Sequence, residues 1–470
     1  MNAMRVVFAT AEFAPLAAVG GLAAASAGLV RSLRSQGVDV ELVLPDYRAE
    51  PLVDESATQL EVPAWAGPAR LRSGSHRSTG PVHLVSVPGI ARPHPYVDLN
   101  GVGWPDNDAR FLAFSAAVVA LADRLEADVV HLNDWHTAAA TAWLRGRRPS
   151  VLSIHNLAYQ GTTSALWLER FGANATAFEW FGSANPLKGG LLLADALVAV
   201  SPSYAAEICT PAGGFGLDRI LTERGVDLVG ILNGIDTDIW NPACDDALTR
   251  HYRAGEPPAR FKNPVRKALA ESLGLRGDEA GPLAVMVTRL TEQKGLDLVL
   301  PLLDYLDTLP LRLAVLGSGD AELAGSLTAA AAADPGRVAF IRSFDEVLAH
   351  RLFAGADLLL MPSRFEPCGL TQMQALRYGT LPVATAVGGL RDTVVDLDAD
   401  PENGNGWLAR SADPLAVLDA LHRAVRGWSN RSRRQAAQQR GMARDWSWHA
   451  PASQYANLYR SIVAAQPRVR

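Results

Sequence analysis

Short apolar runs that end in turn residues alternate with helical segments along almost the whole chain, and this alternation strongly restricts the fold. Near-continuous apolar strands separated by helices are typical of a parallel sheet covered by helices on both faces. The runs form two series, interrupted by a polar, proline-containing stretch at residues 241–264. The first series reads MRVVFAT, VDVELVLP, VHLVSV, ADVVHLN, SVLSIHN, ALVAVSP and LVGILNG; the second reads PLAVMVTRL, LRLAVLGSG, VAFIRSF, ADLLLMPS, TLPVATAVGG and GWLA. The sequence therefore predicts an α/β fold of two doubly wound, Rossmann-like units.

The length of the chain agrees with this division, since 470 residues are too many for one hydrophobic core. We expect an N-terminal domain over residues 1–245, a C-terminal domain over 246–445 and a terminal segment over 446–470. Doubly wound sheets bind ligands beyond the carboxyl ends of their strands. The functional site is therefore expected at those ends, in a cleft between the two domains.

Composition and charge exclude several classes of function. The formal net charge of −5 argues against nucleic acid or an acidic membrane as the main partner. No apolar run approaches the roughly 20 residues of a membrane helix, and no signal peptide is recognisable, so a cytoplasmic protein is expected. Three widely spaced cysteines (Cys209, Cys244 and Cys368) support neither a disulfide framework nor a zinc site. LGSGDAE lacks the last glycine of a dinucleotide fingerprint, and DLDADPENGNGW lacks the glycine and glutamate of a calcium loop, so neither NAD nor a metal is predicted.

The loops that follow the strands of the first series carry candidate binding residues. Gly20 and Gly21 stand between a strand and a helix, where backbone N–H groups are available to a polar ligand. The residues expected beyond the next strand ends are Asp134, Trp135, His155, Asn156, Tyr159 and Gln160. Two structural interpretations remain beside a binding role: His155 can be a structural histidine, and Trp135 can be a packing residue.

The second series places charged residues in the same situation. Arg289 and Lys294 follow one strand, and Glu366, Cys368, Gly369 and Thr371 lie between another strand and a helix that begins near Leu370. Two cations facing a helix N-terminus form a diphosphate clamp, and Glu366 beside it can bind sugar hydroxyls. This combination predicts a nucleotide-sugar donor. The alternatives are a solvated basic face, a helix-capping glutamate and a small buried cysteine.

Long ordered segments of the chain resemble the bacterial glycogen synthases and plant starch synthases, glycosyltransferase family 5. They include HLNDWHTAAATAWL, SIHNLAYQG, VSPSYAAEI, GILNGIDTDIWNP, RLTEQKGLDLVL, PSRFEPCGLTQMQALRYGTLPVATAVGGLRDTVVD and RDWSWHAPASQYANLY. The resemblance implies a GT-B fold, a C-terminal helix that crosses back to the first domain, and metal-independent glucosyl transfer from ADP- or UDP-glucose with retention.

The resemblance also assigns roles to residues of this chain. Arg289 and Lys294 hold the diphosphate with Gly369, Leu370 and Thr371, Glu366 holds the donor sugar, and His155 lies against the reacting sugar. Phe344 stacks on the base, with Gly20, Gly21 and Cys368 also on the donor side. The expected acceptor side comprises Asp134, Trp135, Asn156, Tyr159, Gln160 and Asn233.

The match breaks at the glycine loop. The family pattern Lys-x-Gly-Gly-Leu-Ala-Asp-Val reads here Ala18-Val-Gly-Gly-Leu-Ala-Ala24-Ala. A lysine near the donor phosphates and an aspartate near the acceptor sugar are thus both alanine, while the charges of the second series are kept. Three hypotheses follow: a glycogen synthase with an α-glucan or oligosaccharide acceptor, a diverted relative or pseudo-glycosyltransferase with a cyclitol donor and a small or amine acceptor, as in acarbose-type antibiotic biosynthesis, and a non-catalytic paralogue. The first is the expectation; the sequence specifies no oligomeric state.

Overall fold

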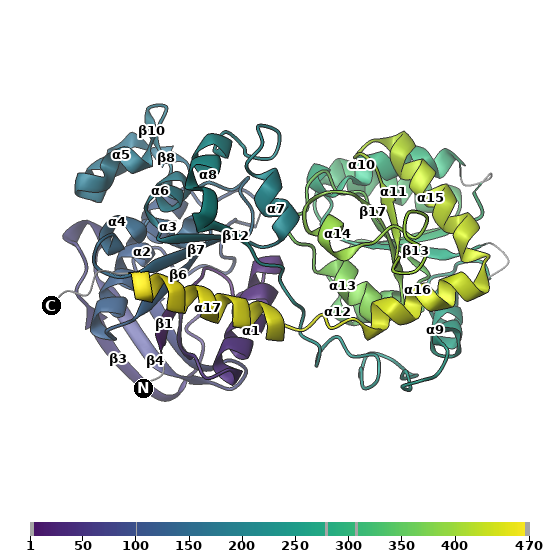
Figure 1. The fold of residues 1–470 in the computed structure, drawn as a ribbon, viewed down its shortest axis with the longest axis horizontal. Coiled ribbons are helices and arrows are strands. Elements are labelled where there is room, and N and C mark those ends of the chain that lie inside the picture. The colour runs from purple at the N-terminus through teal and green to yellow at the C-terminus, as the bar shows by residue number, and fades with distance from the viewer. Residues whose placement is uncertain (1–3, 100, 278–280, 306–308, 466–470) are drawn as a thin grey trace. The chain divides into compact units, whose positions relative to one another are not determined.

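The computed structural model describes residues 4–99, 101–277, 281–305 and 309–465. The chain folds as two units (Figure 1): Met1–Gly234 together with Trp448–Arg470, and Ile235–Ser447. The first unit ends earlier than residue 245, the end expected from the sequence. Asp245 belongs to the second unit because its carboxylate is buried there, 2.7 Å from His350 Nδ1 and hydrogen-bonded to the hydroxyl of Tyr378.

A nine-stranded sheet forms the centre of unit 1, in the order β12-β11-β7-β6-β1-β2-β5-β4-β3. Neighbours from β12 to β5 pair in parallel. Its strands are β1 (Arg5–Ala9), β2 (Asp39–Pro45), β3 (Val53–Leu60), β4 (Ala69–His76), β5 (Gly80–Ser86), β6 (Val129–Asn133), β7 (Ser150–Ile154), β11 (Ala196–Ala199) and β12 (Leu228–Gly230). A small sheet holds β8 (Thr163–Ser164), β9 (Glu179–Trp180) and β10 (Ser183–Ala184).

The helices of unit 1 follow most of these strands, as in other doubly wound folds. They are α1 (Gly21–Ser35), α2 (Asn107–Arg124), α3 (Trp135–Ala138), α4 (Thr141–Leu144), α5 (Ala175–Phe178), α6 (Pro186–Leu193), α7 (Pro202–Glu207), α8 (Asp218–Arg224) and α17 (His449–Ala465), with 3-10 turns at Ala64–Ala66, Ala165–Asn174 and Gly225–Asp227. Each short apolar run of the first series coincides with a strand of this unit.

One edge of the unit 1 sheet departs from the parallel arrangement expected from the sequence. Strands β3 and β4 are antiparallel to each other, and β4 is antiparallel to β5. The sequence pattern does not predict β3, because the strand VDESATQL is exposed over almost its whole length and so has no apolar run. The parallel arrangement expected from the sequence therefore holds from β12 to β5 and does not extend to this edge.

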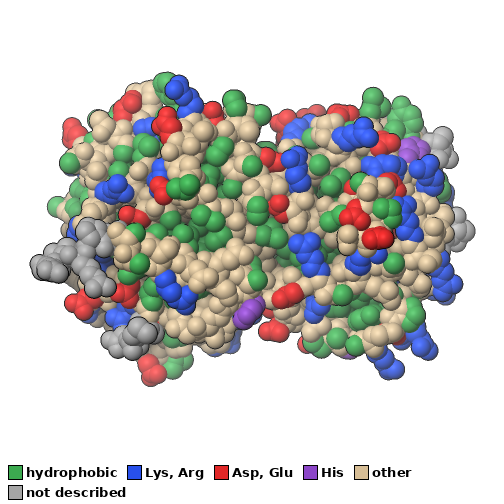
Figure 2. All heavy atoms as spheres, viewed as in Figure 1, with side chains coloured by type: hydrophobic (Ala, Val, Ile, Leu, Met, Phe, Trp, Pro, Cys, Tyr) green, Lys and Arg blue, Asp and Glu red, His purple; other side chains and the backbone are tan. Residues whose placement is uncertain are grey.

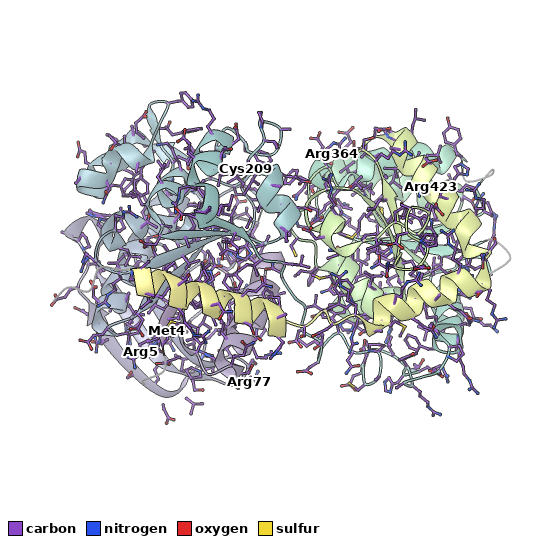
Figure 3. The ribbon with its side chains drawn as sticks, viewed as in Figure 1. Met4, Arg5, Arg77, Cys209, Arg364 and Arg423 are labelled. Atoms are coloured by element: carbon purple, nitrogen blue, oxygen red, sulfur yellow. The ribbon has the colours of Figure 1, made fainter. Side chains whose placement is uncertain are left out.

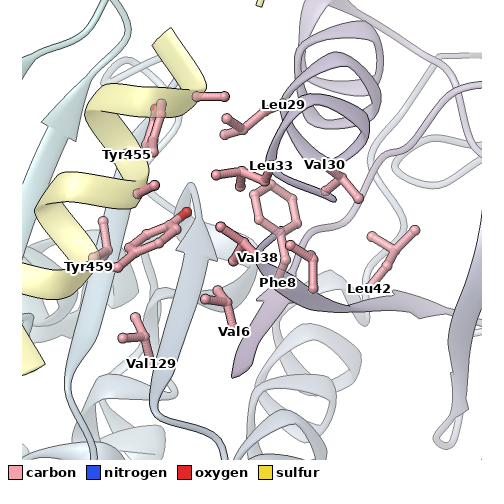
Figure 4. Close-up of a cluster of buried hydrophobic side chains, with 14 of the residues drawn as sticks. Val6, Phe8, Leu29, Val30, Leu33, Val38, Leu42, Val129, Tyr455 and Tyr459 are labelled. Atoms are coloured by element: carbon pink, nitrogen blue, oxygen red, sulfur yellow. The ribbon is translucent and has the colours of Figure 1, made fainter. Parts of the chain in front are cut away.

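The C-terminal helix α17 completes the core of unit 1. Tyr455 and Tyr459 point from it toward Val6, Phe8 and the neighbouring strands (Figure 4). The Tyr459 hydroxyl lies 2.7 Å from His131 Nδ1, and His131 Nε2 lies 2.8 Å from Ser153 Oγ. The segment that leads into α17 also packs tightly on α1, since a Cβ at Gly28 would lie 2.0 Å from the Trp448 ring.

Unit 2 is built on a six-stranded sheet that is parallel throughout, in the order β15-β14-β13-β16-β17-β18. Its strands are β13 (Leu283–Val287), β14 (Arg312–Leu316), β15 (Val338–Ile341), β16 (Leu358–Met361), β17 (Leu381–Thr385) and β18 (Trp407–Ala409). Its helices are α9 (Pro258–Ser272), α10 (Leu296–Val299), α11 (Ala321–Ala333), α12 (Glu346–Gly355), α13 (Thr371–Arg377), α14 (Gly388–Thr393), α15 (Pro414–Trp428) and α16 (Arg431–Ala443), with 3-10 turns at Glu292–Lys294 and Leu300–Tyr305.

Charged side chains of both signs are interspersed on the visible face of each unit (Figure 2). Ion pairs hold several of them, including those of Arg364 with Asp297 at 2.6 Å and of Arg423 with Asp396 at 3.0 Å (arginines labelled in Figure 3). Asp396, the first residue of the calcium-like segment, is thus held by an arginine.

Within the described part of the chain, no helix has the length and hydropathy needed to cross a membrane.

Candidate functional site

The ends of β6 and β7 fix the position of His155. The backbone N–H of His155 donates to Asp134 Oδ1 at 2.7 Å, and that of Asn156 donates to the same oxygen at 3.3 Å. Asp134 has a φ of 53°, an uncommon conformation for a residue other than glycine. His155 Nε2 lies 2.9 Å from Asn133 Oδ1. Asn133, the last residue of β6, therefore holds the ring of His155, and Asp134, which follows it, holds the backbone of His155.

Burial sets the protonation of this group. It lowers the pKa of the His155 imidazole to about 4, so the ring is neutral at physiological pH. It raises the pKa of the Asp134 carboxyl to about 7, against the lowering effect of the two amides that donate to it. A neutral imidazole beside a carboxyl that titrates near pH 7 is typical of a functional site rather than of a solvated surface.

The other predicted acceptor-side residues have different environments. Tyr159 is 55% exposed, and Asn156 Oδ1 accepts from the Ala158 N–H. Two hydrogen bonds fix the side-chain amide of Gln160: its Nε2 donates to the Phe215 carbonyl, and its Oε1 accepts from Asn185 Nδ2.

The structure supports the packing interpretation of Trp135. A Cβ at Gly161 would lie 2.2 Å from its ring, which also contacts Phe111 and His136.

Asn233 is 5% exposed, and its Oδ1 is buried without a hydrogen-bond partner among the described residues. An unpaired amide oxygen at a strand end suits a ligand hydroxyl.

The glycine loop has an internal anion that the sequence pattern did not reveal. Glu12 is 5% exposed, and its Oε2 accepts from the N–H groups of Val19 at 2.9 Å and Gly20 at 2.8 Å. Its Oε1 accepts from the Tyr96 hydroxyl at 2.7 Å. Of the two glycines expected to offer amides to a ligand, Gly20 thus has its N–H occupied by Glu12. The only sign of this contact in the sequence is an acid close to the glycine loop. Gly21 begins α1, which has no capping side chain and no acid in its first turn.

Positions 18 and 24, where the family pattern is broken, are both exposed, Ala18 in this loop and Ala24 near the start of α1. Neither alanine side chain carries a hydrogen bond, and Glu12 shapes the backbone between Ala18 and α1. The conformation of the loop is thus maintained by Glu12 and Tyr96 rather than by side chains at positions 18 and 24.

In unit 2, the loops after β13 and β16 bring Lys294 and Glu366 together. Lys294 Nζ lies 2.9 Å from Glu366 Oε1 and 2.7 Å from Oε2, and Ser363 Oγ donates to Oε2 at 2.9 Å. Lys294 and Glu366 are largely buried, with side-chain exposures of 18% and 7%. Lys294 therefore does not belong to a solvated basic face.

Polar contacts and close packing fix the loops after β13 and β16 against each other. Arg364 pairs with Asp297 and donates from Nη1 to the Glu292 carbonyl at 2.8 Å. Gly295 has a φ of 67°, and a Cβ there would lie 1.9 Å from the Pro362 carbonyl oxygen, so only glycine fits this crossing. Arg289 is exposed at the same strand end and makes no ion pair with a residue that the structure describes.

The remaining predicted donor-side residues lie around the start of α13. Gly369 has a φ of 71°, Leu370 is the N-cap of α13 without a side-chain cap, and Thr371 is its first residue. Glu366 is therefore not the cap of this helix. Cys368 is 5% exposed, as expected for a small buried residue, and Phe344 is 92% exposed. Among the described residues, no cluster of histidine, cysteine, aspartate or glutamate has the form of a metal site.

Comparisons with known proteins relate the whole chain to one family. The model of the starch synthase catalytic domain matches residues 5–223, and the model of glycosyl transferases group 1 matches residues 271–441. Glycogen synthase of Halorhodospira halophila is 45% identical over 98% of this chain and 100% of its own length. Glycogen synthase of Aromatoleum aromaticum is 42% identical over 98% of both chains.

The same relationship holds in three dimensions. The catalytic domain of starch synthase IV from Arabidopsis thaliana, bound to ADP and acarbose, superposes with a TM-score of 0.88 at 31% identity, covering 99% of this chain and 100% of that one. Sucrose-phosphate synthase from Thermosynechococcus elongatus has a TM-score of 0.64 at 20% identity, covering 98% of this chain and 100% of that one, a likeness of fold.

Proposed function

The chain belongs to the glycogen synthase and starch synthase family, and we propose that it extends an α-glucan by transferring glucosyl units with retention of anomeric configuration. Membership of this family makes it a GT-B glycosyltransferase that uses a nucleotide-activated sugar. The observation that carries the finer proposal is the buried Lys294–Glu366 pair with Ser363, at the carboxyl ends of β13 and β16.

Lys294 and Arg289 are proposed to bind the diphosphate of the donor. The Glu366 carboxylate fixes the direction of the Lys294 ammonium group, and the exposed Arg289 supplies a second cation at the same strand end. Both charges stabilise the diphosphate most strongly as it departs and gains negative charge, which lowers the barrier to transfer. The ADP in the starch synthase IV structure supports ADP-glucose as the donor.

Glu366 has one acceptor position left for the sugar. A carboxylate offers about four lone-pair sites. Lys294 lies within hydrogen-bond distance of both oxygens and Ser363 donates to one, which occupies three positions. The remaining position is proposed to accept from a hydroxyl of the transferred glucosyl unit, in agreement with its assignment from the family resemblance.

The acceptor is proposed to be an α-glucan that meets residues of unit 1. Neutral His155, the unpaired amide oxygen of Asn233 and exposed Tyr159 offer hydrogen bonds and an aromatic surface to a saccharide. The full-length relatives are glycogen synthases, which favours a glucan over the cyclitol and amine substrates of the diverted alternative. The retained Arg289, Lys294, Glu366 and His155 argue against a non-catalytic paralogue.

The proposal is tested by transfer of labelled glucose from ADP-glucose, with UDP-glucose compared, onto glycogen. In the same assay, Lys294→Ala and Arg289→Ala should each lower turnover about 10- to 200-fold, from the loss of a charged hydrogen bond worth about 1.5–3 kcal/mol. Lys267→Ala is the matched control, because Lys267 is 80% exposed in its side chain on α9. Equal activity of all three variants would place the donor site elsewhere, and no transfer to glycogen from either donor would reject the glucan proposal.

A further inference from the structure

The side chain of Asn133 is hydrogen-bonded to the His155 ring, and a backbone carbonyl determines the orientation of that side chain. Asn133 is 1% exposed at the end of β6. Its Nδ2 donates to the Ala9 carbonyl at 3.0 Å, and its backbone N–H and carbonyl both bond to Thr137 Oγ1. The side chain therefore has a single arrangement between β1 and the loop after β7.

This arrangement decides which nitrogen of His155 carries the proton. The Ala9 carbonyl can only accept, so the amide NH₂ of Asn133 must face it and the amide oxygen must face His155. A flipped amide would bring two oxygens together at Ala9. Asn133 Oδ1 can only accept from His155 Nε2, 2.9 Å away, so Nε2 is the protonated nitrogen.

A neutral imidazole with its proton on Nε2 has a bare lone pair on Nδ1. No donor from the described residues reaches His155 Nδ1. The ring is neutral because it is buried, and the titratable groups that interact with this residue, Asp134 and His131, form no side-chain ion pair with it. His155 can therefore only accept a hydrogen bond through Nδ1.

We propose that Asn133 is a positioning residue that locks His155 as its Nε2–H tautomer, so that Nδ1 accepts from a hydroxyl of the transferred sugar. The sugar-binding part rests on the proposed function, whereas the tautomer lock does not. A sugar lacking that hydroxyl leaves Nδ1 unpaired and is selected against. Asn133 touches neither sugar nor nucleotide and acts through the ring.

The lock is tested directly by NMR of protein labelled with ¹⁵N-histidine. The ¹⁵N shifts and ¹H–¹⁵N couplings of an imidazole distinguish its two tautomers. The ten histidines are sorted by comparison with His155→Gln, which lacks the signal in question. The unmodified protein should show His155 protonated on Nε2 across pH 6 to 8, and a proton on Nδ1 would overturn the proposal whatever the activity.

Asn133→Leu keeps the branched shape and the number of heavy atoms of the side chain and removes the amide. His155 should then populate both tautomers, and kcat should fall roughly tenfold, the cost of about one hydrogen bond. Binding of ADP by calorimetry should stay within about twofold, because Asn133 lies in unit 1. Ser153→Ala is the matched control. It also removes buried hydrogen bonds at β7, but the hydroxyl that is lost bonds His131 and Tyr455 rather than His155.

The outcomes separate the two proposals. A single Nε2–H tautomer in a protein that transfers no glucose would reject the proposed function and keep the lock. Active enzyme with His155 protonated on Nδ1 would reject the tautomer lock and keep the proposed function. Should Asn133→Leu fail to fold, the measurement on the unmodified protein still decides. An unchanged tautomer in folded Asn133→Leu would show that another group sets it.

Discussion

At the scale of single residues, the candidate site consists of polar groups that are held before any substrate arrives. Asp134 fixes the backbone of His155, Ser363 and Lys294 fix the carboxylate of Glu366, and Glu12 fixes the glycine loop. Groups held in this way need little reorganisation during the reaction, which is how enzymes gain most from electrostatic stabilisation. The same contacts predict that some substitutions affect binding and turnover in opposite directions.

Glu366→Gln is such a substitution. It removes the negative charge that lies against Lys294, leaving the ammonium group free to bind phosphate more strongly. Calorimetry should show ADP bound at least as tightly as by the unmodified enzyme, while kcat falls about 10-fold or more through the altered sugar contact. Glu271→Gln on the exposed end of α9 is the control. Loss of ADP binding would mean that Glu366 mainly maintains the loop.

At the scale of elements, helices and strands carry buried polar contacts in addition to those of the candidate site. Helix α17 is joined to the sheet of unit 1 by Tyr459, His131 and Ser153, and Lys262 of α9 joins the ends of α12 and α13. Polar groups buried in this way are costly when one partner is lost. Each contact therefore predicts a stability effect confined to one unit.

Tyr459→Phe should destabilise unit 1 by about 1–2 kcal/mol, because it leaves His131 Nδ1 buried without its partner. The ring itself is kept, so packing against β1 and β6 is unchanged. Scanning calorimetry should show a lower midpoint for one transition, with ADP binding to unit 2 preserved. Ser461→Ala on the exposed side of α17 is the control. Equal midpoints for the two variants would contradict a role of this hydrogen bond in holding α17.

Lys262 predicts a pH-dependent stability of unit 2. Its Nζ bonds the carbonyls of Phe353, Ala354 and Tyr378 and the hydroxyl of Thr380. Burial lowers its pKa from 10.5 to about 7, so between these values the unfolded chain binds more protons than the folded one at this group. Stability from this group therefore increases as the pH rises from 7 toward 10.

Lys262→Met should remove that increase and lower stability by about 3 kcal/mol at neutral pH, since the carbonyls lose their donor. The measurement is urea unfolding at several pH values, with Lys267→Met, on the same helix but exposed, as the control. A curve for Lys262→Met that runs parallel to the unmodified protein above pH 7 would show that Lys262 is not the titrating group.

At the scale of the whole molecule, the sequence predicted what depends on apolar periodicity and missed what depends on polar contacts between distant segments. The parallel strands, the loops after β6, β7, β13 and β16, and the family were all evident from pattern. Strand β3 was not, because its pairing partners rather than an apolar run make it a strand. Glu12 was not, because its partners Val19 and Tyr96 become neighbours only on folding.

The two units also differ in which charges of the family pattern they keep. Unit 2 has Arg289, Lys294 and Glu366, whereas unit 1 has alanine at positions 18 and 24. If donor binding belongs to unit 2 and acceptor handling to unit 1, the two activities should separate in this protein. It should bind ADP normally, yet elongate glycogen more slowly than a family member with both charges.

Ala18→Lys together with Ala24→Asp should then raise glycogen elongation without changing the fold. Both positions are exposed, and Glu12 holds the loop independently of them, so longer side chains meet no packed core. A charged hydrogen bond worth about 1.5–3 kcal/mol corresponds to a gain of roughly tenfold or more in turnover. Ala24→Asp alone should also stabilise α1 by about 0.3–1 kcal/mol, because its first turn has no acid, and this effect on the midpoint is separable from activity. Rapid elongation by the unmodified protein, with no gain in the double variant, would show that this enzyme transfers glucose without either charge.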